Sequence, residues 1–133
     1  MRWVLLAALI GAAIAAPSSS AVEPGDTAWS KSKRFRAQVL SVPNPIPVNQ
    51  MHRWRVSLRS RAGKPVLGAK IAIGGDMPAH GHGLPTRPQA RGLGGGRYLI
   101  EGVKFQMPGE WYLELRITHR GVRDRVRFVF TLT

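Results

Sequence analysis

The chain has 133 residues, no cysteine, and a formal net charge of +13 from 20 lysines and arginines against seven acidic residues. This length leaves room for one domain, which must be held by its own hydrophobic core because no disulfide can form. Thiolate catalysis is excluded, and a site for a soft metal would have to use methionine and histidine instead.

The N-terminus has the layout of a secretory signal peptide. A short basic start precedes the apolar run VLLAALIGAAIAA, and small residues follow it. The run is shorter than the roughly 20 residues of a membrane-spanning helix. We therefore expect residues 1–21 to be a signal peptide, cleaved at a point between Ala15 and Ala21, and the protein to be periplasmic or secreted. An uncleaved N-terminal anchor is the alternative interpretation.

Residues 22–31 are mostly small and polar and are expected to form a linker. From residue 32 to residue 133, apolar and polar residues alternate in short runs, as at 35–39, 54–58 and 126–132. This period of two is typical of half-buried strands, and no window has a helical period. Prolines and glycines separate the runs. The pattern predicts an all-β domain, an antiparallel β-sandwich of about six to eight strands.

The segment 74–96 is rich in glycine and proline and is expected to be the longest loop, where function concentrates. It contains Met77, His80 and His82. In an extended segment the two histidines project to the same side, so both rings could reach one ion. The competing interpretation is a solvated loop that happens to contain histidines.

Met107 ends another predicted strand, and Pro108-Gly109 follows as a turn. Since strand ends and loops meet at the ends of a sandwich, Met107 could approach Met77, His80 and His82. Two imidazoles with one or two thioethers suit copper, above all Cu(I). Zinc with Asp76 as a further ligand remains open, and both methionines could equally be core residues.

Several motifs of the chain resemble the YtkA-like/FixH-type family of small exported domains. They are G-x-P-V-x-G-A-x-I-x-I at 63–73, M-P-x-H-x-H-G at 77–83, G-x-Y at 96–98 and F-x-M-P-G-x-W at 105–111, and the resemblance extends over about 52–132. It implies an immunoglobulin-like β-sandwich outside the cytoplasm and a link to copper handling. The ligands it implies are Met77, His80, His82 and Met107. FixH-type proteins keep a transmembrane anchor, whereas this chain offers only a signal peptide.

Other candidate residues carry weaker signals. Met51-His52 could be a second soft pair, but His52 is better interpreted as a strand-start residue near solvent. His119 lies in THRG and is expected in the turn before the last strand. Trp54 and Trp111 fall on inward-facing positions and are expected in the core.

No pattern of an enzyme is present. The acidic residues are scattered, without paired carboxylates for acid–base work. There is no G-x-S-x-G motif and no phosphate-binding glycine loop. Catalysis is therefore not expected.

The sequence predicts an exported copper-binding domain, a carrier or accessory factor in copper handling or for a periplasmic redox enzyme. The basic strands could contact an acidic envelope protein, a redox enzyme or an anionic membrane surface, or they could be an ordinary solvated face. Export argues against nucleic acid. The alternative function is a metal-free immunoglobulin-like module that docks on an acidic envelope partner.

Overall fold

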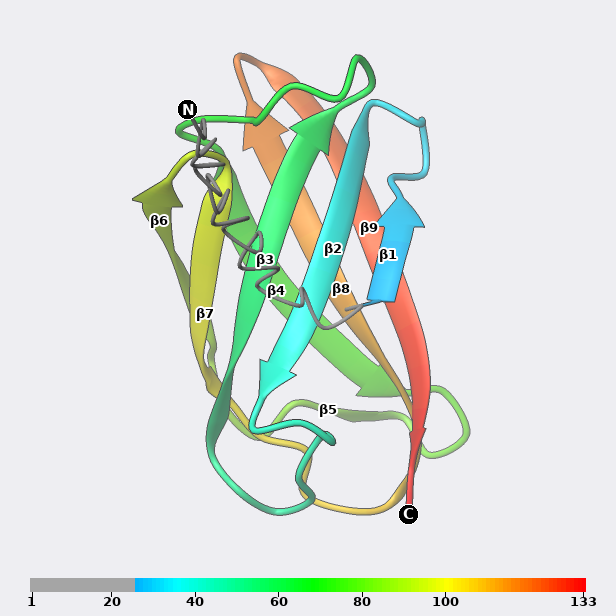
Figure 1. Ribbon diagram of the computed structural model, residues 1–133. Coiled ribbons are helices and arrows are strands. Elements are labelled where there is room, and N and C mark those ends of the chain that lie inside the picture. Colours follow the sequence, from blue (N-terminus) through cyan, green and yellow to red (C-terminus); the bar gives the residue numbers. More distant parts are fainter. Residues whose placement is uncertain (1–25) are drawn as a thin grey trace, which may run out of the picture.

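The computed structural model describes residues 26–133; the predicted signal peptide lies outside this range. The described residues form nine strands and no helix (Figure 1). The strands are β1 (Asp26–Trp29), β2 (Phe35–Val42), β3 (His52–Ser60), β4 (Lys70–Met77), β5 (His82–Gly83), β6 (Gln89–Gly94), β7 (Arg97–Val103), β8 (Gly109–His119) and β9 (Val122–Leu132).

Two antiparallel sheets face each other. One has the order β1-β2-β3-β7-β6 and the other β5-β4-β8-β9. The series β2-β3-β7-β6 and β4-β8-β9 reproduce the two sheets of an immunoglobulin constant-type domain, with β1 and β5 added at edges. The predicted immunoglobulin-like antiparallel β-sandwich is confirmed.

The alternation along the strands places one face of each sheet in the core. Along β2, for example, Phe35, Ala37 and Val39 are buried while the residues between them face outward. Trp54 and Trp111 are 2% and 0% exposed, so their predicted core positions are confirmed.

The segment 74–96 differs from the expectation of one long loop. β4 continues to Met77, β5 pairs with its end, and β6 occupies 89–94. The prediction was wrong because the end of β4 from Gly74 to Met77, and the whole of β6, show no regular alternation of apolar and polar residues. In addition, the stretch expected as a linker contains β1, which pairs with β2.

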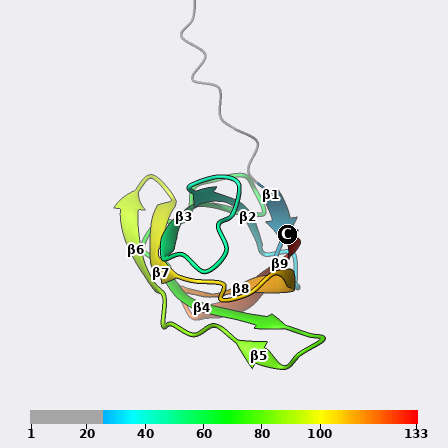
Figure 2. The same ribbon diagram turned by 90° about the horizontal axis from the view of Figure 1, so that it is seen from below.

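The two ends of the sandwich carry different features. The end that we name the hairpin end holds the β4–β5 hairpin and the β7–β8 connection, at the bottom of Figure 1. The opposite end holds the β8–β9 turn. Seen from below in Figure 2, β5 lies beyond β4, at the margin of its sheet. Residues 26–133 include no helix long and apolar enough to cross a membrane.

Candidate metal centre

The β4–β5 hairpin brings three of the four predicted ligands together. The backbone N–H groups of His80 and Gly81 both donate to the Met77 carbonyl, at 3.0 and 2.9 Å, and close the turn. Gly81 has φ of +64°, which glycine adopts without steric cost. Met77 then lies directly opposite His82 in the strand register. Opposed residues of an antiparallel pair project from the same face, so His82 projects from the face that carries Met77.

The two imidazoles of the hairpin lie next to each other at the surface. His80 and His82 are both exposed, and their ring centres are 6.2 Å apart with the planes 24° from parallel. A nitrogen–metal bond of about 2 Å, with roughly 1 Å more to the ring centre, puts two imidazoles on one ion about 5–6 Å apart. The observed separation of the two ring centres is close to this range.

The β7–β8 connection, with the fourth predicted ligand, packs against this hairpin. Gln106 Nε2 in the connection donates a hydrogen bond to the Gly83 carbonyl in the hairpin at 3.3 Å. A β-carbon placed on Gly109 would lie 2.7 Å from the Met77 methyl carbon. Met107 itself is half-buried, and its carbonyl accepts the indole N–H of Trp111 at 3.0 Å. The two motif segments are therefore neighbours at the hairpin end.

The two methionines differ in how readily an ion could reach them. Met77 is 0% exposed and belongs to the core cluster, whereas Met107 packs against the edge of that cluster. Met107 is therefore the thioether that solvent reaches more readily, whereas Met77 is enclosed in the core.

A family comparison decides what kind of domain this is. The family model described as YtkA-like matches residues 30–116, well over half of the chain. The chain belongs to the YtkA-like family. The predicted resemblance is confirmed, and both motif segments of the candidate site lie within the matched range. No curated protein matches the sequence.

Two solved structures share the fold of this YtkA-like domain. A DUF4426 family protein from Pseudomonas aeruginosa PAO1 has a TM-score of 0.58 and 10% identity, over 84% of this chain and 96% of that one. A copper-bound variant of FetP from uropathogenic Escherichia coli strain F11 has a TM-score of 0.54 and 8% identity, over 83% of this chain and 95% of that one. At such identities the likeness establishes the fold alone.

Asp76 is the carboxylate that could complete a zinc site with the two histidines. Residues 26–133 contain no group of three or more histidine, aspartate or glutamate side chains placed to share an ion. Asp76, the carboxylate nearest in sequence, accepts the N–H of Met77 at 2.7 Å through Oδ1. A zinc site of His80, His82 and Asp76 is therefore not preformed, and a mixed imidazole–thioether site matches the donors that are present.

His52 is not the solvent-facing residue expected from the sequence. It begins β3 as predicted, but it is only 6% exposed. Its Nδ1 lies 2.9 Å from the Gln50 carbonyl, and the Trp54 indole N–H donates to its Nε2 at 3.0 Å. Burial lowers the pKa of His52, an effect opposed by the hydrogen bond to Gln50. The expectation was wrong because the ring fills an aromatic cluster with Trp54 and Phe105.

The remaining candidates lie apart from the hairpin. Met51 is 59% exposed while its neighbour His52 is buried, so the two do not form an exposed soft pair. His119 ends β8, next to the turn where it was expected, and its ring meets Phe35 edge-on at 6.4 Å. That places it at the end of the sandwich opposite His80 and His82.

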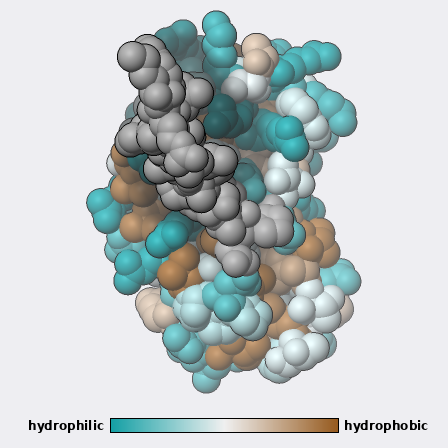
Figure 3. Space-filling model, viewed as in Figure 1, coloured by the Kyte–Doolittle hydropathy of each residue, from teal (hydrophilic) through white to brown (hydrophobic). Residues whose placement is uncertain are grey.

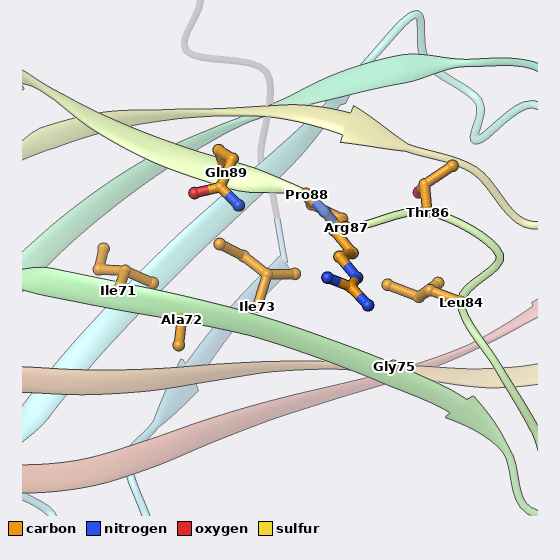
Figure 4. A pocket seen from close by; sticks show the side chains of 9 residues that line it. All are labelled: Ile71, Ala72, Ile73, Gly75, Leu84, Thr86, Arg87, Pro88 and Gln89. Carbon is orange, nitrogen blue, oxygen red and sulfur yellow. The ribbon is translucent and has the colours of Figure 1, made fainter.

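A separate pocket of about 440 Å³ lies between β4 and the segment 84–89 (Figure 4). Isoleucines of β4 line one side, and Leu84, Arg87 and Pro88 are among the residues on the other. None of its lining residues is a histidine or methionine, so the pocket is not the metal centre.

Proposed function

We propose that this YtkA-like protein is an exported copper-binding domain that acts as a carrier or as an accessory factor for a periplasmic redox enzyme. His80 and His82 would hold the ion with the Met107 thioether, and Met77 would contribute when the hairpin opens. The role is binding and transfer, without catalysis by the chain itself.

One observation carries this proposal: the hairpin with Met77, His80 and His82 packs directly against the connection with Met107. These segments are more than twenty residues apart in sequence, and nothing in their local patterns requires the contact. Imidazole and thioether together favour Cu(I), with imidazole alone also serving Cu(II). The copper-bound FetP variant shares the fold, which adds support.

Metal titration of the purified protein tests the proposal. Cu(I) is added in competition with a chromophoric chelator, Cu(II) is added separately, and the double variant His80→Ala/His82→Ala is compared with the parent. We expect the affinity for either ion to fall more than roughly 100-fold, since both imidazole ligands are lost. Equal binding by both proteins, or binding by neither, contradicts the proposal.

His119→Ala is the matched control. It removes one imidazole at the opposite end of the sandwich. Copper affinity should stay within about twofold of the parent value. An equal loss in the control would indicate adventitious binding by any surface histidine.

The second candidate function is a metal-free module that docks on an acidic envelope partner. The observation in its favour is the excess of unpaired arginine: in residues 26–133 the ion pairs are Arg91–Glu101 and Arg127–Glu114, against many more basic side chains. Capture of a partner that is salt-sensitive, but unaffected by chelator and by His80→Ala/His82→Ala, would support it.

A further inference from the structure

Two arginines face each other on the outer side of the five-stranded sheet. Arg36 of β2 lies directly opposite Arg59 of β3, and Gln38 lies opposite Ser57 in the same pair of strands. Opposed residues share a face with their β-carbons about 5 Å apart, and like charges in such positions repel each other. The arrangement costs stability unless something between the two guanidinium groups offsets the repulsion.

The protein itself holds both arginines without neutralising them. Arg59 Nη1 donates to the Gly63 carbonyl at 2.9 Å, and the Arg36 guanidinium lies 5.9 Å from the centre of the Trp29 ring. Neither belongs to an ion pair within the described range of the chain. Each therefore has a neutral anchor that fixes its position and leaves its charge available.

A hollow of about 230 Å³ lies between these side chains. Its lining consists of Thr27, Arg36, Gln38, Ser57 and Arg59. The hollow is smaller than pockets for drug-sized ligands, which begin near 300 Å³. The guanidinium groups of Arg36 and Arg59 lie there beside the Gln38 amide and the Ser57 hydroxyl, and the lining contains no carboxylate.

The surroundings add further positive charge. Arg97 lies opposite Ser57 on β7, and Arg55 and Arg53 continue the outward row of β3. Within the described residues, the salt bridge on this face joins Arg91 to Glu101. In Figure 3, hydrophilic side chains are numerous at the top of the molecule and occur lower down as well. A field of this sign attracts anions to the hollow.

We propose that this hollow binds a small multivalent oxyanion of the phosphate class, gripped by Arg36 and Arg59. Planar guanidinium groups match the oxygens of such an anion two at a time. Gln38 and Ser57 supply neutral donors for the remaining oxygens. The site lies towards the end of the sandwich opposite His80 and His82. Anion binding there can therefore be tested independently of copper binding.

The test measures binding of inorganic phosphate to the purified protein, by calorimetry and by the NMR signals of the arginine Nε–H groups. Saturable binding is expected in the parent. Arg36→Gln/Arg59→Gln should weaken it at least roughly tenfold, because charge-assisted hydrogen bonds are lost. Arg36→Lys/Arg59→Lys should also weaken it, since lysine keeps the charge but not the fork. Circular dichroism checks that each variant is folded.

Arg116→Gln/Arg125→Gln is the matched control. These arginines are also exposed and directly opposed, on the outer face of the other sheet, so the variant loses the same charge. Phosphate affinity within about twofold of the parent supports a specific site. Equal weakening in both double variants, or no saturable binding in the parent, overturns the proposal.

Vesicles distinguish the two sources of such an oxyanion. Phosphatidylglycerol vesicles are compared with vesicles of phosphatidylcholine alone. If Arg36→Gln/Arg59→Gln loses binding to the anionic vesicles and Arg116→Gln/Arg125→Gln does not, the oxyanion is a lipid headgroup. If only inorganic phosphate discriminates between the variants, it is a free anion. If vesicle binding weakens equally in both variants and phosphate binding is not saturable, the binding reflects net charge alone. That result overturns the proposed anion site.

Discussion

The methyl group of Met77 rests against the backbone of Gly109, so closely that a β-carbon at Gly109 would lie 2.7 Å from it. Met77 ends β4 and Gly109 begins β8. The contact therefore joins the histidine-bearing hairpin to the connection that carries Met107. Glycine at this position lets the two segments of the candidate centre meet.

Replacing Gly109 by alanine should destabilise the fold by about 2–3 kcal/mol. Its φ of +128° is a backbone conformation that residues with a β-carbon rarely adopt. The new methyl group must also displace the Met77 side chain from its place in the core. Urea unfolding followed by tryptophan fluorescence measures the change.

Gly121→Ala is the comparison for a positive φ, with milder backbone strain and without the contact. Gly121 has φ of +74°, and a β-carbon there would meet nothing within 4 Å. We expect this variant to lose only about 1 kcal/mol. If Gly109→Ala costs no more than Gly121→Ala, the contact with Met77 contributes nothing to stability.

The strands with apolar–polar alternation could be predicted from the sequence. Residues such as Phe35, Val39, Trp54 and Trp111 alternate with polar neighbours, and burial of one sheet face accounts for that pattern. The motif segments at 77–83 and 105–111 were also expected at one end of the fold, and the hydrogen bond from Gln106 to the Gly83 carbonyl joins them there. Local patterns were sufficient wherever one face of a strand is buried and the other is solvated.

The strand that carries the site could not be predicted in the same way. The glycines favour a loop from residue 74 onward, but β4 runs through Gly74 and Gly75 to Met77. Gly75 is required by close approach: a β-carbon would lie 2.9 Å from the Tyr112 carbonyl oxygen and 3.0 Å from Leu84 Cγ. The burial of His52 likewise depends on Phe105, which is far away in sequence. Such tertiary contacts leave no local periodic signal.

Gly75→Ala should destabilise the protein by about 1–3 kcal/mol and loosen the hairpin. The Tyr112 carbonyl belongs to the neighbouring strand and cannot move aside, so Leu84 and the segment after β5 must shift. Thermal unfolding measures the stability, and amide hydrogen exchange at residues 78–83 reports on the hairpin. Gly83→Ala is the control, because the nearest atom to its β-carbon would be 3.8 Å away. Unchanged exchange in both variants would show that the hairpin does not depend on this contact.

The two methionines should respond differently to leucine. Met107→Leu should lower Cu(I) affinity roughly tenfold, with a smaller effect on Cu(II), because a soft thioether is removed from a half-buried position. Met77→Leu should change Cu(I) affinity less, since Met77 is fully buried. Both substitutions conserve volume and should cost less than about 1.5 kcal/mol of stability. Titration with Cu(I) checks the order; a greater loss in Met77→Leu would make Met77 the principal thioether ligand.

His52 should make stability depend on pH. Its pKa is lowered in the folded protein, whereas the unfolded chain has the ordinary value of about 6.5. Between these two values the unfolded state binds more protons than the folded state, so the free energy of unfolding rises with pH there. The contribution of neutral His52 is fully present above pH of about 6.5 and is lost as pH falls through the lowered folded value.

The Trp54 indole N–H donates to His52 Nε2 at 3.0 Å. Protonation of His52 would turn Nε2 from an acceptor into a donor and would break this hydrogen bond. His52→Gln offers an acceptor to that indole but does not titrate, so its stability should change less between pH 7 and pH 5 than that of the parent. The His80→Ala/His82→Ala variant, which leaves the cluster around His52 intact, is measured for comparison. Chemical denaturation at several pH values measures all three proteins. Equal slopes in the parent and His52→Gln would mean that His52 is not the group that titrates.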